Sequence, residues 1–270
     1  MEEIGNSKHP EYKYAQSLLR EGERSRLGYY LVETANFVQQ ALASRAEVSG
    51  VFALAKEAER FAARCVERGV PLYVLSAGLM NKLVGTSYET AVTAIATVKQ
   101  GVLTPEQLPL QNETLLLAGE RIQDPRNVGV LVRTAEAAGC TALLLSQDSA
   151  DPFSRASVRS STGSIVRLPI CQVPDLPAVL RQLQEQGVQV VASSARAPHT
   201  LYEAPLAQRP LLLLVGNETE GLTEQARVAA SEFVRVPMSE DGPSSLNVTV
   251  ATGVLLFEAI RQFQARNDPS

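Results

Sequence analysis

The sequence predicts an α/β protein of two domains, and three observations support this prediction. Short apolar runs with strand character alternate with amphipathic helical segments along the chain. Some of these runs, such as "LLLLV" at 211–215, are apolar at every position, as is typical of strands buried on both faces of a parallel sheet. Residues 101–112 contain two prolines and little hydrophobic periodicity, which indicates a linker. We therefore expect a smaller domain at 1–100 and a larger one at 113–270.

The first domain shows helical and strand patterns in strict alternation, which favours a layered sheet with largely parallel pairing. Hydrophobic periodicity places the boundaries of each element, and Gly69 ends one of the helices. The expected elements are a helix at 12–27, a strand at 29–33, a helix at 34–45, a strand at 48–54, a helix at 56–68, a strand at 70–75, a helix at 77–84 and a strand at 93–99.

The second domain repeats the alternation with longer and more apolar strand runs. The expected strands are 114–119, 142–146, 164–170, 188–194, 210–216 and 233–238. The expected helices fall near 127–138, 175–186, 222–231 and 245–265. No internal repeat and no low-complexity tract interrupts the series.

Composition excludes several classes of protein. A hydrophobic content of 45% and a charged content of 20% are those of a globular chain. No apolar run approaches the roughly 20 residues that a membrane helix needs, and the N-terminus lacks the apolar segment of a secretory signal. The cysteines Cys65, Cys140 and Cys171 lack CxxC spacing and lie among apolar residues. We expect buried, reduced thiols and a cytoplasmic location.

Histidines and charge narrow the chemistry further. His9 and His199 are the only histidines, which disfavours both a metal cluster and a Ser-His-Asp triad. The net charge is −4, yet residues 1–100 are nearly neutral, with 12 Lys and Arg against 11 Asp and Glu. Residues 8–26 hold six basic residues, His9 included. Charge alone leaves two interpretations of this segment open, an RNA-facing arm and a solvated helix face.

Unusual polar groups follow three of the expected strands in the second domain, at the sheet edge where open α/β sheets bind ligands. After 114–119 comes "RIQDPRNVGVLVR", where Asn127 is placed to cap a helix and Gly129 permits close approach. After 210–216 comes "GNETEGL", where two glycines allow a tight turn that exposes backbone amides. After 233–238 comes "GPSSLN", with Ser244 or Ser245 as the expected cap of the last helix.

The residues that carry these features are Asn127-x-Gly129-x-x-x-Arg133-x-Ala135, Gly216-x-Glu218-x-x-Gly221-Leu222 and Pro237-Met238 with Ser245-Leu246-Asn247-Val248. In this order they resemble the three motifs of SpoU-type RNA 2′-O-ribose methyltransferases, a family of the SPOUT superfamily. The resemblance is strong over about 112–264. Over 8–100 the chain more loosely resembles an RNA substrate-binding domain that is related in fold to a ribosomal protein. A Rossmann-type methyltransferase would instead carry a Gly-rich loop after its first strand, and the segment "GERIQDPRNVG" lacks the Gly-x-Gly-x-x-Gly pattern.

The resemblance implies a catalytic domain with a deep trefoil knot, a topology that is rare among proteins and that periodicity cannot predict. It implies S-adenosylmethionine as cofactor, held by segments 190–196, 214–221 and 236–248, and no metal. The cofactor-binding residues that it implies are Ser193, Leu214, Gly216, Gly221, Val236, Met238 and Leu246. The catalytic residues that it implies are Arg133, Asn127, Glu218, Ser245 and Asn247.

Methyl transfer to a ribose hydroxyl requires positioning and the removal of a proton from a poor nucleophile. Arg133 matches the arginine for which the family suggests a base role, but a guanidinium with a pKa above 12 is a reluctant base. Stabilisation of the developing alkoxide and contact with an RNA phosphate suit it better. Glu218 is suited to fix the Arg133 guanidinium through a bidentate pair.

Several alternatives stay open at this level. Analogy favours ribosomal RNA over tRNA as the substrate. A catalytically silent RNA-binding protein on the same scaffold is disfavoured by the intact Arg133, Glu218 and Asn247. A nucleotide-binding protein with accidental motif matches is disfavoured because all three motifs occur in the expected order. The resemblance also implies a homodimer, for which apolar residues of the last helix (Val250, Val254, Leu255, Phe257 and Ile260) and small residues of the first catalytic-domain helix offer a surface. Burial of these residues within a single chain is the competing interpretation.

Overall fold

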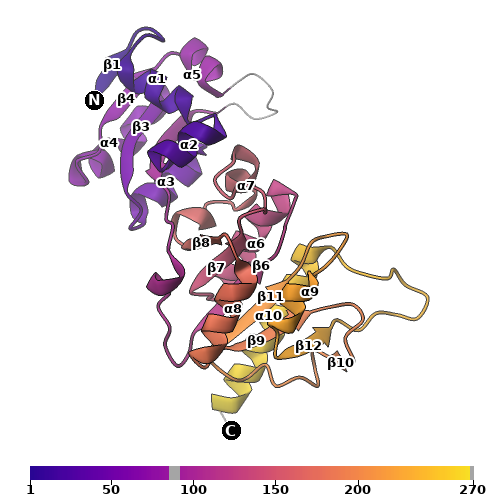
Figure 1. Cartoon of the computed structure of the whole chain (residues 1–270). Helices are drawn as coiled ribbons and strands as arrows, with labels where there is room; N and C mark the ends of the chain where they lie inside the picture. Colours follow the sequence, from indigo (N-terminus) through magenta and orange to yellow (C-terminus); the bar gives the residue numbers. More distant parts are fainter. Residues whose placement is uncertain (85–91, 268–270) are drawn as a thin grey trace. The chain divides into compact units, whose positions relative to one another are not determined.

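The computed structural model describes residues 1–84 and 92–267 (Figure 1). Residues 85–91 of the expected first domain and residues 268–270 of the expected second domain lie outside the described part. The chain divides into two compact units. Met1–Gly101 and Asp151–Arg167 form the first unit, and Val102–Ala150 and Leu168–Ser270 form the second. The segment 151–167, which the sequence placed with the second domain, thus clusters with the first unit. The functional division into a substrate-binding and a catalytic domain stays a prediction.

The first unit is built on a five-stranded sheet of order β1-β4-β3-β5-β2. Its strands are β1 (Glu2–Ile4), β2 (Tyr29–Glu33), β3 (Val48–Leu54), β4 (Leu72–Leu75) and β5 (Ala94–Lys99). Its helices are α1 (Pro10–Ser17), α2 (Glu21–Leu27), α3 (Ala35–Ala43), α4 (Ala55–Glu67), α5 (Ala77–Val84) and α7 (Arg155–Ser160). The expectation of largely parallel pairing was wrong, because β5 lies between β2 and β3 and runs antiparallel to both.

The helix expected at 12–27 is broken into α1 and α2. Leu18, at the break, is only 1% exposed. The Nη1 group of Arg24, on α2, donates to the carbonyl oxygens of Leu18 and Leu19 at 3.1 and 3.0 Å. Arg24 therefore satisfies carbonyl groups that the end of α1 would otherwise leave unpaired. At least one basic residue of the segment 8–26, Arg24, is therefore buried and stabilises the fold, so it is neither solvated nor available to RNA.

The segment 151–167 is held in the first unit by charged and aromatic contacts. Asp151 pairs with Arg24, with 2.6 Å between Oδ2 and Nη2. Phe153 packs on Tyr30 with ring centroids 5.0 Å apart. Arg155 donates to both carboxylate oxygens of Glu33. These contacts join α7 and the turn before it to α2 and β2.

The strand expected at 164–170 was wrong. Gly163 adopts a left-handed φ of 94°, and residues Ser164–Val166 form a 3₁₀ turn. This positive φ is a conformation that favours glycine, and a Cβ there would also displace the end of the Gln40 side chain. Ile165 and Val166 are apolar because this turn is buried, not because they pair in a sheet. The strand β8 begins only at Ile170, after Pro169.

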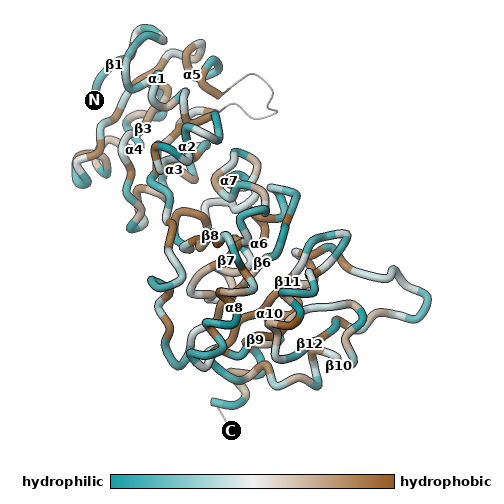
Figure 2. The backbone as a smooth tube through the Cα atoms, viewed as in Figure 1, coloured by the Kyte–Doolittle hydropathy of each residue, from teal (hydrophilic) through white to brown (hydrophobic). Residues whose placement is uncertain are grey.

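The second unit contains a seven-stranded sheet of order β10-β12-β9-β11-β6-β7-β8, in which every pairing is parallel. Its strands are β6 (Leu115–Gly119), β7 (Ala142–Ser146), β8 (Ile170–Val173), β9 (Gln189–Ser193), β10 (His199–Thr200), β11 (Leu211–Val215) and β12 (Glu232–Arg235). Its α-helices are α6 (Pro125–Ala137), α8 (Leu176–Glu185), α9 (Glu224–Val228) and α10 (Val248–Asn267). Hydrophobic residues follow the central strands of this sheet (Figure 2).

Alternation along the strands divides the core of the second unit between two faces. Leu116, Leu144, Leu212 and their even-numbered neighbours share one hydrophobic cluster with residues of α8 and α9. The odd-numbered strand residues, such as Leu213, are equally buried. Helix α10 contacts β11, helix α6 contacts β7, and the two helices contact each other. The expected linker also joins this unit, since Leu108 is 7% exposed within the same cluster.

The cysteines lie in the interior, as expected. Cys65, Cys140 and Cys171 are free and buried. Burial raises the pKa of the Cys140 thiol to about 12 and that of the Cys171 thiol to about 11. Both groups are therefore protonated and unreactive near neutral pH. Within 1–84 and 92–267, no helix combines the length and the apolar character needed to cross a membrane.

Candidate functional site

A polar cavity lies at the carboxyl end of the parallel sheet. Strands β12, β9, β11 and β6 are consecutive neighbours and all run in one direction, so the segments that follow them meet at one edge. The cavity has a volume of about 400 Å³. It is lined by Ser193–Arg196 after β9, by Val215–Leu222 after β11, by residues between 236 and 246 after β12, and by Val248 and Ala251 of α10. This is where open α/β sheets bind ligands, and the volume suits a small organic molecule.

The loop after β11 is shaped by two glycines and one asparagine. The backbone N–H groups of Asn217 and Gly221 donate to each other's carbonyl oxygens at 3.1 and 3.0 Å. Gly221 adopts a φ of 71°, which favours glycine. The Oδ1 atom of Asn217 accepts hydrogen bonds from the backbone N–H groups of Thr219 and Glu220. The loop is thus a closed turn held by its own hydrogen bonds.

Gly216 is the position in this loop that tolerates substitution least. A Cβ there would lie 2.5 Å from the carbonyl carbon of Gly221, and overpacking of this kind costs about 1–3 kcal/mol. We expect Gly216→Ala to weaken binding of the expected cofactor, S-adenosylmethionine, by about tenfold, as measured by calorimetry. Gly253→Ala is the control, because its Cβ would make an ordinary contact with Thr134 at 3.8 Å. Equal affinities in the two variants would contradict the prediction.

Glu218 points from this loop to the start of α6. Its carboxylate accepts hydrogen bonds from the backbone N–H groups of Gln123 and Asp124 at 3.2 and 3.3 Å, and from Nδ2 of Asn127 at 2.8 Å. Burial by itself would raise the pKa of Glu218, but the hydrogen bonds from Asn127 and the backbone outweigh burial and lower it. The carboxylate is therefore ionised near neutral pH, at a helix N-terminus that favours negative charge.

The start of α6 differs from the expected one. The helix begins at Pro125, and Oδ1 of Asp124 accepts from the backbone N–H of Arg126, so Asp124 is the N-cap. Asn127 lies inside the first turn, and its side chain is free to contact Glu218. The assignment of the cap to Asn127 was wrong, because Pro125 occupies the first helical position and the cap lies three residues earlier, at Asp124.

The start of α10 differs as well. Asn247 is the cap, since its Oδ1 accepts from the backbone N–H of Thr249 at 2.9 Å and its carbonyl accepts from Ala251. Ser244 and Ser245 were the expected caps. They lie before the helix start and line the cavity instead. Nδ2 of Asn247 also reaches Oδ1 of Asn127 at 3.4 Å, which connects the starts of α10 and α6.

Arg133 lies on the exposed surface of α6. Its guanidinium contacts no hydrogen-bonding or ionic partner within the described residues, and the pair with Glu218 that the sequence led us to expect is not formed. Arg133 lies six residues beyond Asn127, or about 9 Å along a helix. The structure thus joins Asn127, Glu218 and Asn247 in one hydrogen-bonded chain and leaves Arg133 free to contact a substrate.

The remaining expected residues divide clearly. Ser193, Gly216, Gly221, Val236, Met238, Leu246, Glu218 and Ser245 line the cavity. Leu214 does not, because it is fully buried in β11 with its side chain in the core. Leu222, Arg227 and Ala251 line the cavity outside the expected segments. Asn217 was not singled out from the sequence. The signal that could have found it is the residue type, because an asparagine next to a glycine often forms a turn through its own side chain. No group of His, Cys, Asp or Glu side chains that could hold a metal ion occurs in the part of the chain that the structure describes.

Comparison with known proteins places this architecture in a family. The model of the SpoU rRNA methylase family matches residues 114–257. The chain belongs to the SpoU rRNA methylase family. A second model, the N terminus of the thiostrepton-resistance methylases, matches residues 1–107. Together the two matches cover most of this SpoU family member.

Relatives and solved structures agree with the assignment. A protein of Synechocystis described as an uncharacterized tRNA/rRNA methyltransferase is 32% identical over 98% of this chain and 96% of its own. The 23S rRNA (guanosine-2′-O-)-methyltransferase RlmB of Escherichia coli is 34% identical over 58% of this chain and 64% of its own. An AdoMet-bound rRNA methyltransferase from Sinorhizobium meliloti superposes with a TM-score of 0.85 at 27% identity, over 96% of this chain and 97% of that one. The AdoMet complex of the SpoU methyltransferase AviRb from Streptomyces viridochromogenes has a TM-score of 0.83 at 26% identity, over 94% of this chain and 98% of that one.

Proposed function

We propose that this SpoU family member transfers a methyl group from S-adenosylmethionine to a ribose 2′-hydroxyl of ribosomal RNA. The observation that carries the proposal is the cavity at the carboxyl end of the sheet. Its walls come from the same segments that carry two of the family motifs, 216–222 and 236–248. The third motif, which contains Asn127 and Arg133, is joined to these walls through Glu218 and Asn247.

The residues present fit S-adenosylmethionine. The cavity combines apolar side chains, among them Leu222, Val236 and Met238, with the polar turn 216–221. An apolar wall suits an adenine ring, and polar groups beside it suit a ribose and an amino acid. When bound, the cofactor supplies an electrophilic methyl group on a sulfonium. Ser193, Gly216, Gly221 and Leu246 would hold it, mainly through backbone groups.

The remaining chemistry falls to side chains of the chain itself. Asn127 donates to Glu218 and accepts from Asn247, so the two asparagines lie together at the starts of α6 and α10. These groups orient a ribose, and Ser245 of the cavity wall adds a further hydroxyl. Arg133 is exposed and has no partner among the residues that the structure describes, which suits a group that contacts a phosphate and stabilises a developing alkoxide. A guanidinium is a reluctant base, which argues against that role for Arg133.

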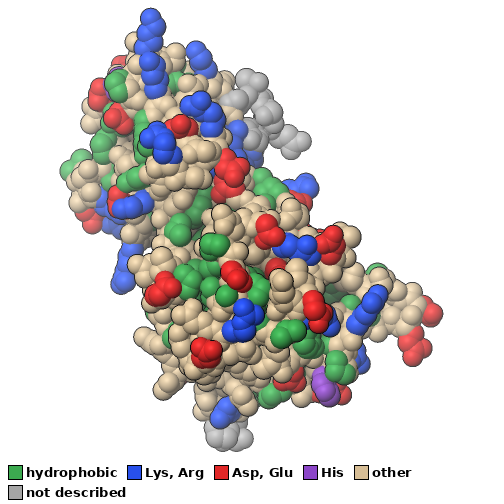
Figure 3. All heavy atoms as spheres, in the orientation of Figure 1, with side chains coloured by type: hydrophobic (Ala, Val, Ile, Leu, Met, Phe, Trp, Pro, Cys, Tyr) green, Lys and Arg blue, Asp and Glu red, His purple; other side chains and the backbone are tan. Residues whose placement is uncertain are grey.

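Ribosomal RNA is favoured over tRNA by the N-terminal region. Residues 1–107 match the N terminus of methylases named for resistance to an antibiotic, and the E. coli relative is named for 23S rRNA. Lys and Arg side chains project from the visible face of the first unit (Figure 3). Such charges suit the phosphate backbone of RNA. A tRNA methyltransferase and a catalytically silent RNA-binding protein are the alternatives that the assay below distinguishes.

We further propose that the protein acts as a cytoplasmic homodimer with a trefoil-knotted catalytic domain. Val250 and Phe257 of α10 are 52% and 54% exposed. They are seven residues apart, so they share one face of the helix. Leu255 is 1% exposed and belongs to the core of the single chain. An exposed apolar stripe of this kind is typical of a surface that a second copy covers. Sedimentation at micromolar concentration should give about twice the 29.1 kDa chain mass.

The decisive assay incubates the protein and tritiated S-adenosylmethionine with protein-free ribosomal RNA in one reaction and tRNA in another. We expect tritium in ribosomal RNA, resistant to alkaline hydrolysis at one linkage because a 2′-O-methyl group blocks cleavage there. Label in tRNA alone would select the tRNA alternative. Cofactor binding without label in either RNA would favour the silent RNA-binding protein, and the absence of cofactor binding would refute the proposal.

A further inference from the structure

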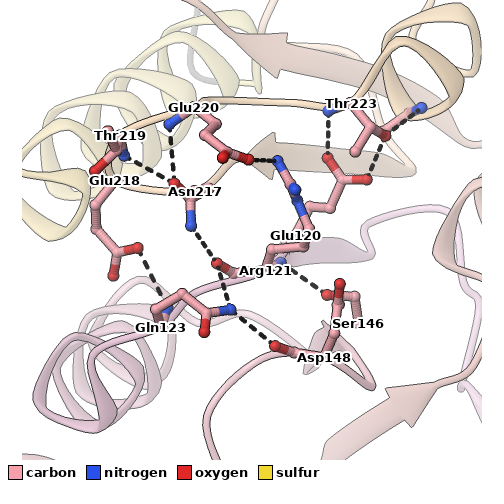
Figure 4. Close-up of polar contacts among 11 residues, drawn as sticks. Glu120, Arg121, Gln123, Ser146, Asp148, Asn217, Glu218, Thr219, Glu220 and Thr223 are labelled. Carbon is pink, nitrogen blue, oxygen red and sulfur yellow. Dashed lines mark hydrogen bonds and ion pairs between the residues drawn. The ribbon is translucent and has the colours of Figure 1, made fainter.

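Two consecutive residues after β6 hold the loop 216–223 from the side opposite the cavity. Figure 4 shows Glu120 reaching Thr223 and Arg121 reaching Glu220. We propose that Glu120 and Arg121 are positioning residues, which fix this loop in the shape that binds the cofactor. The inference rests on the proposed function, since it assigns a role in the site where the cofactor is expected.

Glu120 anchors the far end of the loop. Its carboxylate is buried, with the residue 4% exposed, and accepts two hydrogen bonds from Thr223, one from the backbone N–H at 2.8 Å and one from Oγ1 at 2.6 Å. Thr223 is in turn the N-cap of α9. Hydrogen bonds to an ionised group are stronger than neutral ones, and a buried donor left unpaired is unfavourable. The end of the loop and the start of α9 are therefore both fixed to the end of β6.

Arg121 anchors the middle and the near end. Its Nη2 atom lies 2.7 Å from Oε2 of Glu220, and its carbonyl accepts from Nδ2 of Asn217 at 2.8 Å. Its own N–H donates to Oγ of Ser146 at 2.7 Å, which fixes the residue to the end of β7. Arg121 thus connects β6 and β7 with two positions of the loop.

The presence of arginine at this position is unfavourable for the fold alone. Arg121 adopts a φ of 54°, a conformation that glycine adopts without strain. Its Nε–H is buried and has no hydrogen-bond partner in the described part of the chain. Glycine would avoid both penalties and keep the backbone contacts to Asn217 and Ser146. What the arginine side chain adds is the ion pair with Glu220. We therefore assign the function of Arg121 to this pair.

Glu120 and Arg121 act through the loop and not on a ligand. Val215–Leu222 line the cavity, whereas Glu120 and Arg121 do not. They line a separate hollow together with Thr223 and Asp148. Glu218 lies between Asn217 and Glu220, the two positions that Arg121 contacts, and is held by the first turn of α6 and the residues before it, through Gln123, Asp124 and Asn127. Segment 120–127 therefore fastens the loop along its length and leaves its other side to the cavity.

The test measures affinity for S-adenosylmethionine by calorimetry, turnover at saturating cofactor, thermal unfolding and hydrogen exchange of the 216–223 amides without cofactor. We expect Arg121→Gly to weaken cofactor binding by about three- to fivefold, the range for a partly exposed ion pair, without lowering the unfolding midpoint. We expect Glu120→Gln to weaken binding by about tenfold. Both variants should exchange faster in 216–223 and keep a near-normal kcat. Thr223→Ser keeps the hydroxyl and should bind S-adenosylmethionine with normal affinity. Thr223→Val lacks the hydroxyl and should bind it more weakly.

Arg181→Ala, which removes an exposed arginine from α8, is the matched control and should change none of these quantities. Normal cofactor affinity in Arg121→Gly and Glu120→Gln would overturn the inference. So would a loss of affinity in Arg121→Gly that is fully explained by a lower unfolding midpoint. If the wild-type protein does not bind the cofactor, the proposed function fails. Exchange at 216–223 then still decides whether the two residues hold the loop.

Discussion

Arg133→Ala is expected to reduce methylation of RNA on the order of 10³-fold, the upper range for removal of one group that stabilises charge in a transition state. Affinity for S-adenosylmethionine should stay within about twofold of wild type, because a twofold change is under 0.5 kcal/mol and Arg133 does not line the cavity. The guanidinium is exposed on α6 and unpaired among the described residues, so its removal leaves no buried group without a partner. The unfolding midpoint should therefore be unchanged.

Arg133→Lys separates charge from geometry. A lysine ammonium keeps the charge but not the planar pair of donors, so we expect most activity to be lost here too. The measurement is single-turnover methylation with calorimetry on the same samples, and Arg181→Ala is the control. Normal turnover by Arg133→Ala would remove Arg133 from the mechanism. Normal turnover by Arg133→Lys alone would show that charge suffices.

Arg155→Met is expected to destabilise the first unit by about 3–5 kcal/mol, the range for removing one partner of a buried ion pair. Glu33 is 2% exposed, and both its carboxylate oxygens accept from Arg155. Without the guanidinium, the carboxylate stays buried without this compensation. Urea denaturation followed by hydrogen exchange in β2 measures the effect.

A second substitution tests the cause. Glu33→Gln combined with Arg155→Met removes the buried charge as well, and we expect it to be clearly more stable than Arg155→Met alone. Arg64→Ala is the control within the same unit, since Arg64 and Glu67 form an exposed pair that should contribute under about 1 kcal/mol. An effect of Arg155→Met no larger than that of Arg64→Ala would show that α7 is not held by this pair.

The sequence by itself determined that the second unit is built on a parallel sheet and which strand ends lead into its cavity. Runs such as Leu211–Val215 are short and apolar at every position, as is typical of strands covered on both faces, and the structure confirms the parallel sheet. Gly216 and Gly221 were visible because few other residues allow a turn so tight. Ser193, Val236, Met238 and Leu246 followed from the resemblance to the family, and all line the cavity.

Only the tertiary structure decided which distant groups pair. Glu218 was expected to hold Arg133 but contacts the start of α6, because a carboxylate next to free N–H groups finds more donors there than a single guanidinium offers. The segment 151–167 lies within the expected second domain in the sequence, yet it packs in the first unit through Asp151, Phe153 and Arg155. Ile165 and Val166 have strand character, and a left-handed Gly163 turns them into a buried 3₁₀ turn. The local hydrophobic pattern of the sequence predicts whether a residue is buried. The partner that buries it, or that compensates its charge, lies far away in the sequence, 91 residues away for Glu218 and Asn127 and 127 for Arg24 and Asp151.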